Sequence, residues 1–480
     1  MEAIKLAGLE PANVFGYFEK ICSIPHGSRN TKMISDYLVS FAQEHGLRYI
    51  QDESNNVILF QEGTCGMEDH APVILQGHMD MVSEKDADSP INLETDGLDV
   101  QHDGRHVFAK GTTLGGDDGI AIAYALAILA DKSIPHPPLE VIITVDEEIG
   151  MLGADAIDLS QLKGRTMINI DSEEEGIFTV SCAGGATATL TLNVNRRAVY
   201  GPCIRLVVDG LQGGHSGAEI HKNRANANKV MGEFMSRIQK LMPLCLTSIS
   251  GGSKDNAIPR SCQATLVAMG LNLERINDIA EQLQAEIRQQ YDEPEAMVQA
   301  FDVDALGGNS LSTESTAKII GLLCAAPNAV QRMSPDIEGL VQTSLNMGII
   351  KLGDQFSATF SVRSSVNTEK REVLDQLQKL AAFYEGAYSV MGDYPGWEFR
   401  KESPLRDTMV SIFRKMFDKE PEILAIHAGL ECGLLGEKLP GLDCVSIGPD
   451  MQDIHTSREK LDIASTKRVW EFLLEVLKAL

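Results

Sequence analysis

Four short apolar runs, each followed by acidic or imidazole side chains, constrain the fold of this chain more than any other feature. Apolar residues occupy both faces of these runs, and helical segments separate the runs in the first part of the chain. This pattern is typical of a mostly parallel sheet that carries helices on both faces. The four runs are residues 73–75, 139–145, 167–170 and 444–447.

The middle of the chain has a different pattern. After residue 183, apolar and polar residues alternate, as they do in strands with one exposed face. Alternating segments are found at 188–194, 204–208, 264–269 and 355–362, helical spacing at 225–242, 273–289 and 369–391, and a turn sequence at 392–396. We therefore predict an α+β domain with antiparallel strands over 184–396, inserted into an α/β domain formed by 1–183 and 397–480.

Charge and composition exclude several classes of partner and location. The 480 residues carry a net charge of −26, which repels nucleic acid and anionic membranes. The longest apolar run, 120–130, is about half the length of a membrane span. Residues 1–11 show no signal peptide, and the nine cysteines form no CxxC pair, so we expect a reducing, cytoplasmic location.

Chemically active side chains follow the predicted parallel strands. Ligands in open α/β sheets bind beyond the carboxyl ends of the strands. The residues at these ends are His78 and Asp80, Asp146 to Glu148, Asp171, and Asp453 and His455. We therefore expect the functional site at this edge of the predicted sheet.

Two further patterns favour a bound cation, although each has a structural alternative. Asp146, Glu147 and Glu148 repel one another, which a cation or a shared proton relieves, but they also fit a charged loop. Asp117 lies in a glycine-rich segment before the apolar run 120–130, where it also fits a helix cap. Imidazole and carboxylate ligands without thiolate suit Zn²⁺, Mn²⁺ or Co²⁺, and a carboxylate between two ions can bridge them.

These residues resemble the M20 family of dinuclear zinc peptidases. The resemblance covers nearly the whole chain, and residues 427–433 are similar to the aminoacyl-histidine dipeptidase branch. The matching segments are residues 76–80, 115–119, 146–150, 213–217 and 256–259, together with Asp171 and His455. The resemblance implies a discontinuous catalytic domain with an inserted domain that acts as a lid and dimerises.

The resemblance also implies roles for the residues of the catalytic domain. His78 and Asp171 hold one Zn²⁺, Glu148 and His455 hold the other, and Asp117 bridges the two. Co²⁺ or Mn²⁺ are possible substitutes. Asp80 orients His78, and Glu147 is the general base that accepts a proton as a metal-bound hydroxide attacks the substrate.

Four residues of the inserted domain and the 427–433 segment are implied to contact the substrate. His215 stabilises the oxyanion, acting in the active site of the partner subunit of a homodimer, and Asn256 assists it. Arg363 holds the C-terminal carboxylate of the substrate, because a guanidinium binds a carboxylate through two hydrogen bonds. His427 is predicted to contact the substrate.

The sequence thus predicts a cytoplasmic zinc dipeptidase that hydrolyses unblocked dipeptides, including Xaa-His. One alternative is another M20-type amidohydrolase, either a tripeptide aminopeptidase or an N-acyl amino acid deacylase. The other is a non-catalytic protein that binds metal or peptide on the same fold, because a fold alone does not establish activity.

Overall fold

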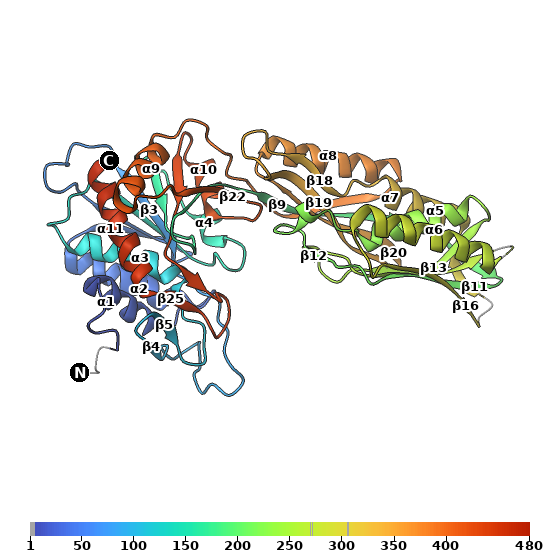
Figure 1. Ribbon diagram of the computed structural model, residues 1–480, viewed down its shortest axis with the longest axis horizontal. Helices are drawn as coiled ribbons and strands as arrows, with labels where there is room; N and C mark the ends of the chain where they lie inside the picture. The colour runs from blue at the N-terminus through green and yellow to red at the C-terminus, as the bar shows by residue number, and fades with distance from the viewer. Residues whose placement is uncertain (1–4, 269, 271, 305–306) are drawn as a thin grey trace. The chain divides into compact units, whose positions relative to one another are not determined.

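The chain forms two compact units in the computed structural model (Figure 1). The structure describes residues 5–268, 270, 272–304 and 307–480. Unit 1 comprises the chain up to Ser181 together with Phe399–Ala425 and Leu430–Leu480. Unit 2 comprises Cys182–Glu398 and the short segment Ile426–Gly429.

Unit 1 is built on an eight-stranded sheet with a parallel centre. The neighbouring strands β6, β3, β7 and β23 pair in parallel, whereas β1, β2 and β8 add antiparallel pairs on either side. The order is β1 (Arg48–Gln51), β2 (Val57–Gln61), β6 (Leu139–Thr144), β3 (Val73–His78), β7 (Thr166–Asn169), β23 (Asp443–Ser446), β8 (Ile177–Cys182) and β22 (Glu422–Ile426). The predicted mixed α/β fold with a mostly parallel sheet is confirmed, and the parallel pairs lie at its centre.

Helices pack on this sheet through their apolar residues. The apolar run predicted at 120–130 lies in α3 (Gly116–Ala130), which packs between β3 and α1 (Ala12–Cys22) and is buried almost throughout. Apolar residues on every side of α3 are therefore explained by its place in the core. The other helices of unit 1 are α2 (Lys32–His45), α4 (Leu152–Ala156), α9 (Pro404–Phe417), α10 (Glu431–Lys438) and α11 (Ile463–Ala479).

A second, smaller sheet of unit 1 lies in the order β24, β25, β5 and β4. Its pairs are antiparallel, and it joins residues that follow His455 to a hairpin far earlier in the chain. The strands are β24 (Met451–Gln452), β25 (Lys460–Asp462), β5 (His106–Ala109) and β4 (Val100–His102).

Unit 2 contains a long antiparallel sheet. Its strands alternate buried and exposed residues, as β9 shows, and the buried side chains form a core separate from that of unit 1. The order is β16 (Met297–Val303), β11 (Cys203–Asp209), β15 (Cys262–Ala268), β13 (Leu244–Gly251), β19 (Val341–Leu352), β20 (Gln355–Ser364), β9 (Gly184–Asn193) and β21 (Ala387–Tyr394), with β18 (Ala329–Met333) beside β19. Met269, at the end of the predicted segment 264–269, lies outside the described residues.

The remaining elements of unit 2 are helices and short strand pairs. β10 (Arg196–Tyr200) pairs with β17 (Gly307–Leu311), and β12 (Gly214–His215) pairs with β14 (Ala257–Ile258). The helices are α5 (Ala227–Gln239), α6 (Leu273–Tyr291), α7 (Thr313–Ala325), α8 (Asn367–Phe383) and the 3₁₀ turn η1 (Ile220–Lys222).

The prediction of a helix over 369–391 is wrong for the second part of this range. α8 ends at Phe383, and residues 387–394 form β21, so part of the predicted turn at 392–396 is also strand. Glu385 has a positive φ of 57°, and the N–H of Gly386 donates to the carbonyl of Ala381 at 2.8 Å. This left-handed closure ends the helix, and pairing with β9 determines the strand that follows.

The segment Ile426–Gly429 belongs to unit 2, although our prediction placed all of 397–480 in the discontinuous domain. The N–H of Ala183 donates to the carbonyl oxygens of Ile426 and Ala428 at 3.2 and 2.9 Å. These contacts attach His427 to the start of unit 2. No helix among the described residues is both long and apolar enough to cross a membrane.

Candidate metal centre and a basic cluster

Six side chains of unit 1 converge beyond the carboxyl ends of the central strands, and we call them the acidic centre. Three elements supply most of them, because β3 ends at His78, Glu147 and Glu148 follow β6, and Asp171 follows β7. The acidic centre comprises His78, Asp117, Glu147, Glu148, Asp171 and His455. The parallel pairing of β6, β3 and β7 brings these strand ends to one edge.

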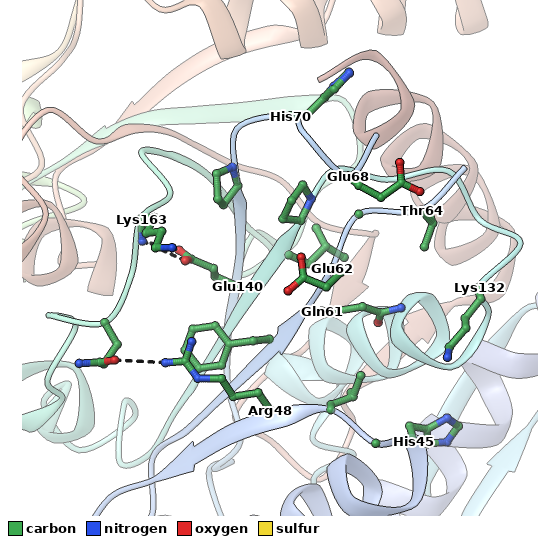
Figure 2. A pocket seen from close by; sticks show the side chains of 18 residues that line it. His45, Arg48, Gln61, Glu62, Thr64, Glu68, His70, Lys132, Glu140 and Lys163 are labelled. Carbon is green, nitrogen blue, oxygen red and sulfur yellow. Dashed lines mark hydrogen bonds between the residues drawn. The ribbon is translucent and has the colours of Figure 1, made fainter. Parts of the chain in front are cut away.

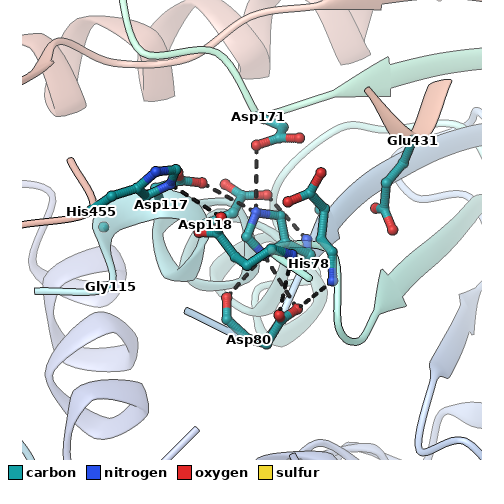
Figure 3. A network of polar contacts seen from close by, with 12 residues as sticks. His78, Asp80, Gly115, Asp117, Asp118, Asp171, Glu431 and His455 are labelled. Carbon is teal, nitrogen blue, oxygen red and sulfur yellow. Dashed lines mark hydrogen bonds and ion pairs between the residues drawn. The ribbon is translucent and has the colours of Figure 1, made fainter. Parts of the chain in front are cut away.

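Asp117 occupies the middle of the acidic centre, with His78 and His455 on either side (Figure 3). Its Oδ1 lies 3.1 Å from Nε2 of His78, and its Oδ2 lies 3.2 Å from Nε2 of His455. His78 Nε2 is also 3.6 Å from Asp171, and His455 Nε2 is 3.1 Å from Glu148. Each oxygen of Asp117 therefore faces a different imidazole–carboxylate pair, which is the geometry of a bridging ligand.

Asp80 positions several groups of the acidic centre. Its backbone carbonyl lies 2.9 Å from Nδ1 of His78, so that nitrogen carries the proton and Nε2 faces the carboxylates. The Asp80 carboxylate is 3.6 Å from Nδ1 and accepts hydrogen bonds from the N–H groups of Glu147 and Glu148 at 3.0 and 3.4 Å. Asp80 thus places the loop after β6 as well as the His78 ring.

The loop after β6 turns sharply, and its three carboxylates point in different directions. Asp146 has a positive φ of 55°, and its Oδ1 accepts from the N–H of Arg29 at 2.5 Å, whereas Glu148 faces His455. The Oε1 atom of Glu148 is buried and has no hydrogen-bond partner in the part of the chain that the structure describes. A buried carboxylate oxygen without a donor is suited to bind a cation.

The pKa shifts in the acidic centre show that negative charge is in excess there. Burial, with Asp117 and Glu148 nearby, raises the pKa of Asp171 to about 6, and burial raises the pKa of Glu147 well above its usual value. Hydrogen bonds to Asp117 and Glu148 raise the pKa of His455 to about 10. The protein therefore favours added positive charge at this point, whether protons or metal ions supply it.

Two buried carboxyl groups beside the acidic centre were not predicted to be part of it. Asp118 accepts the N–H of His78 at 3.1 Å, and burial raises its pKa well above the usual value. Glu431 is fully buried at the start of α10 and accepts hydrogen bonds from Gln76 and Thr144, both at 2.6 Å. Burial raises the pKa of Glu431 to about 8, and no pattern in the sequence links it to the strand ends.

Three predicted substrate residues gather in unit 2, and we call His215, Arg363 and His427 the basic cluster. They meet around Gly217, where an added Cβ would lie 2.7 Å from the carbonyl oxygen of His427 and 3.2 Å from Nε of Arg363. That Nε atom is buried and has no hydrogen-bond partner among the described residues. Only glycine leaves room for this approach, which explains sterically why the motif at 213–217 ends in glycine.

Hydrogen bonds orient both imidazoles of the basic cluster. Nδ1 of His215 accepts from the N–H groups of Gly217 and Ala218 at 3.2 and 3.0 Å, so the proton of the neutral ring is on Nε2. Nε2 of His427 lies 2.7 Å from Oγ of Ser344, the residue opposite Arg363 in the sheet. Burial and the charge of Arg363 lower the pKa of both rings, that of His427 to about 4.

Asn256 is attached to the basic cluster through its backbone. Its carbonyl accepts from the N–H of Ser216 at 2.8 Å, and its side chain is exposed. The short pairing of β12 with β14 brings residues 256–259 beside His215. The structure therefore brings all four predicted substrate residues into one region of unit 2.

A separate pocket of about 660 Å³ lies at the other end of the sheet of unit 1 (Figure 2). Pro72, Pro138 and Leu139 line it, and these residues mark the amino ends of β3 and β6. Its lining includes side chains of both charges. The basic ones include Arg48, Lys132 and Lys163, and the acidic ones are Glu62, Glu68 and Glu140. Among the described residues, the groups that could hold a metal ion lie at the opposite strand ends, where Asp118 joins His78 and Asp171 in one such group.

The family model described as "Peptidase family M20/M25/M40" matches residues 74–479, which include the whole acidic centre. The chain belongs to this peptidase family. The match also covers all of unit 2, so the inserted region is part of the family pattern.

Relatives of this M20 chain extend over its full length. It is 37% identical over 479 residues to the cytosol non-specific dipeptidase of Escherichia coli (strain K12), with 99% of each chain covered. The crystal structure of aminoacylhistidine dipeptidase from Vibrio alginolyticus is 36% identical and superposes with a TM-score of 0.94, covering 99% of this chain and 98% of that one. Aminopeptidase PepT from Bacillus cereus, at 14% identity, a TM-score of 0.56 and 98% coverage of both chains, shares the fold alone.

Proposed function

We propose that this M20 peptidase is a metal-dependent dipeptidase that hydrolyses unblocked dipeptides, including Xaa-His. The observation that carries the proposal is the position of the Asp117 carboxylate, with one oxygen toward His78 and the other toward His455. The two full-length relatives, one named a non-specific dipeptidase and the other an aminoacylhistidine dipeptidase, favour this substrate class over other amide substrates.

The residues of the acidic centre fit two zinc ions. His78 and Asp171 would hold one ion, Glu148 and His455 the other, and Asp117 would bridge them. Neutral imidazole and carboxylate ligands without thiolate are typical of catalytic zinc, and Co²⁺ or Mn²⁺ suit the same set. When bound, such ions supply Lewis-acid polarisation of a water molecule and of the scissile carbonyl.

Glu147 is the general base in this proposal. Its backbone N–H is fixed by Asp80, and burial, with the Asp171 carboxylate nearby, raises the pKa of its carboxyl group. A carboxylate with a raised pKa takes a proton from the attacking water more readily than an ordinary glutamate. The same group then returns the proton to the leaving amine.

His215 is proposed to donate a hydrogen bond to the oxyanion that forms on the substrate. The two backbone N–H groups on Nδ1 keep the Nε2 proton available, and the lowered pKa keeps the ring neutral at pH 7. A neutral donor that is held in place before the reaction stabilises developing charge without reorganisation. We propose that Asn256, joined to Ser216, assists His215.

Arg363 is proposed to bind the C-terminal carboxylate of the dipeptide, with His427 beside it. The buried, unpartnered Nε of Arg363 supports this role, because a desolvated guanidinium N–H gains most from a charged acceptor. A fixed carboxylate site also restricts the length of the substrate, which is what distinguishes a dipeptidase from a general aminopeptidase.

A substrate panel tests the proposed function. Purified protein loaded with Zn²⁺ is assayed on Gly-His, β-Ala-His, Leu-Gly, a tripeptide and N-acetyl-His, with and without a chelator. We expect cleavage of Gly-His and Leu-Gly that the chelator abolishes and that added Zn²⁺ restores. β-Ala-His has one more methylene group than Gly-His between the amino group and the scissile bond. Its rate relative to Gly-His shows whether the site accepts this longer separation.

Two other results of this panel would contradict the proposal. Cleavage of only the tripeptide or only N-acetyl-His would make the chain a tripeptide aminopeptidase or an N-acyl amino acid deacylase. Tight metal binding without turnover of any substrate would indicate a protein that binds metal or peptide without catalysis.

We further propose that the protein is a homodimer formed through unit 2. The edge strand β16 exposes Met297 and Phe301, which are 40% and 43% accessible, and such an edge is suited to pair with a second copy. Light scattering tests the dimer, with Phe301→Asp as the variant expected to weaken it.

A mixing experiment tests whether His215 acts on the partner subunit's site. Glu147→Gln and His215→Ala are each expected to be inactive alone. If His215 acts across the dimer, subunit exchange between the two variants restores about a quarter of the wild-type activity, because each mixed dimer has one intact site. Activity that stays at the level of the separate variants would show that His215 acts within its own chain.

A cytoplasmic location is also part of the proposal. The cysteines of the described residues form no disulfide bond, which suits a reducing compartment, and the relative from Escherichia coli is named a cytosolic enzyme. Fractionation of the source cells with an antibody against this chain tests it.

A further inference from the structure

Glu459 is a buried carboxylate close to the acidic centre that the proposed reaction does not use. Its side chain is 3% exposed and lies at the start of α3 rather than in solvent. Oε2 accepts from the N–H groups of Leu114 and Gly115 at 2.8 and 3.1 Å. Oε1 accepts from the N–H groups of Gly116 and Asp117 at 2.8 and 3.4 Å.

These hydrogen bonds hold the segment that carries Asp117. Asp117 and Asp118 have non-helical φ and ψ angles, so the segment from Leu114 to Asp118 is a turn that precedes the regular part of α3. Glu459 supplies the acceptors for four N–H groups of this turn, which would otherwise be buried without a partner. The backbone of Asp117 is therefore fixed by a carboxylate from a distant part of the chain.

The glycines of this segment permit the close approach. Gly115 has a positive φ of 68°, which glycine adopts without strain. A Cβ on Gly116 would lie 3.2 Å from both Oε1 of Glu459 and Sδ of Met451, so a side chain there would press on the carboxylate and on Met451. The glycine pair before Asp117 thus fits the Glu459 carboxylate as well as the turn.

Glu459 also belongs to the segment that carries His455. The N–H of Glu459 donates to the carbonyl of Thr456 at 3.2 Å, and Oγ of Thr456 donates to the carbonyl of Asp453 at 2.7 Å, so residues 453–459 form one hydrogen-bonded turn. β25, which begins at Lys460, pairs with β5 and anchors this turn in the small sheet. One carboxylate therefore ties the backbone of Asp117 to the segment of His455.

We propose that Glu459 is a positioning residue that sets the distance between Asp117 and His455 and thereby the affinity for the metal ion between them. This inference rests on the proposed metal centre. The two ligands are far apart in the sequence, and their side chains meet at 3.2 Å. Loss of a group that orients metal ligands without touching the metal typically weakens metal binding about 10- to 100-fold.

The chain offers a matched control in Glu140. This carboxylate is 5% exposed and likewise accepts backbone N–H groups, from Lys163 at 2.9 and 3.2 Å and from Gly164 at 2.9 Å. It lies in β6 beside the pocket at the other end of the sheet, away from the metal ligands (Figure 2). Glu140→Gln therefore removes the same kind of interaction without touching the acidic centre.

The experiment compares Glu459→Gln, Glu140→Gln and wild type. Dissociation constants for Zn²⁺ are measured by competition with a chromogenic chelator, and thermal unfolding of the metal-free proteins is measured in parallel. Both substitutions place an amide NH₂ opposite backbone N–H groups, so both should lower the melting temperature. Only Glu459→Gln should weaken the binding of one Zn²⁺ by about tenfold or more, while Glu140→Gln stays within about twofold of wild type.

The remaining outcomes separate this inference from the proposed function. Equal Zn²⁺ affinities of the two variants would overturn the role of Glu459 and leave the metal centre intact. A wild-type protein that binds no Zn²⁺ would overturn the metal centre and this inference with it.

Gly116→Ala decides the question if Glu459→Gln does not fold. This substitution keeps the Glu459 charge but presses on its carboxylate. Weaker Zn²⁺ binding by Gly116→Ala supports the positioning role, and unchanged binding contradicts it.

Discussion

The acidic centre of unit 1 and the basic cluster of unit 2 are built in opposite ways. Carboxylates crowd the first, and burial raises the pKa of Asp171 and Glu147. The second contains a guanidinium, and burial, together with the charge of Arg363, lowers the pKa of His215 and His427. The first region is suited to cations and the second to anions, so each matches a different part of the proposed reaction.

The two regions also differ in how the chain assembles them. Four of the six residues of the acidic centre lie at or shortly after the carboxyl ends of the parallel strands β3, β6 and β7, so the pairing of these strands determines their position. The basic cluster needs a glycine with no side chain, a bulge-free pairing of Ser344 with Arg363, and a four-residue segment from late in the chain. Substitutions in the acidic centre should therefore change kcat. In the basic cluster, substitution of His215 should also change kcat, whereas substitution of Arg363 should change the affinity for the substrate.

Glu147→Gln should have the largest effect on catalysis. We expect kcat to fall about 10²- to 10⁴-fold, because an amide cannot accept the proton of the attacking water. The KM for Gly-His and the Zn²⁺ content should remain close to those of wild type, as metal analysis and steady-state kinetics would show. If Glu147→Gln kept full activity and full metal content, Glu147 would not be the general base.

Arg363→Ala should affect substrate affinity instead. We expect KM for Gly-His to rise about 10- to 100-fold, the cost of a lost hydrogen bond to a charged group, with a smaller change in kcat. The matched substrate is Gly-His amide, which has no C-terminal carboxylate and should bind equally poorly to both proteins. An equal loss with both substrates would mean that Arg363 has another role.

Gly217→Ala should damage the basic cluster without removing any of its functional groups. The added methyl would lie 2.7 Å from the carbonyl oxygen of His427, so the loop has to move. We expect kcat/KM to fall about tenfold and the free energy of unfolding to decrease by about 1–3 kcal/mol. Gly436→Ala is the control, because open space surrounds that helical glycine and alanine should stabilise it slightly. Wild-type kinetics for Gly217→Ala would contradict the close packing of the basic cluster around Gly217.

Glu431→Gln should have the smallest effect and should concern stability rather than rate. The pKa of Glu431 is raised to about 8, so the folded protein keeps it protonated while the unfolded chain ionises it near its usual value. Its contribution is therefore fully present at low pH and declines as pH rises from about 4.5 through 8. The neutral glutamine removes this decline.

Thermal unfolding of the metal-free proteins from pH 5 to pH 8.5 checks the Glu431 prediction. The melting temperature of Glu431→Gln relative to wild type should increase by about 2–4 °C across this range. If the difference in melting temperature between the two proteins does not change with pH, Glu431 has the same pKa in the folded and the unfolded state.

The sequence predicted the acidic centre better than the rest of the molecule. Apolar runs that end in His78, Asp171 and the residues after β6 are local patterns, and parallel pairing brings their ends together by a general rule. Glu459 escaped detection because it reaches its partners through tertiary packing, with no spacing that links it to them. Helix α8 was predicted too long because a single left-handed residue, Glu385, ends it and pairing with β9 creates β21.

Anomalous diffraction at the zinc edge tests whether Asp117 bridges two metal ions. We predict two peaks in crystals grown with Zn²⁺, one on either side of the Asp117 carboxylate. One peak should lie beside His78 and Asp171, and the other beside Glu148 and His455. A single peak, or peaks that do not touch Asp117, would show that Asp117 does not bridge two metal ions.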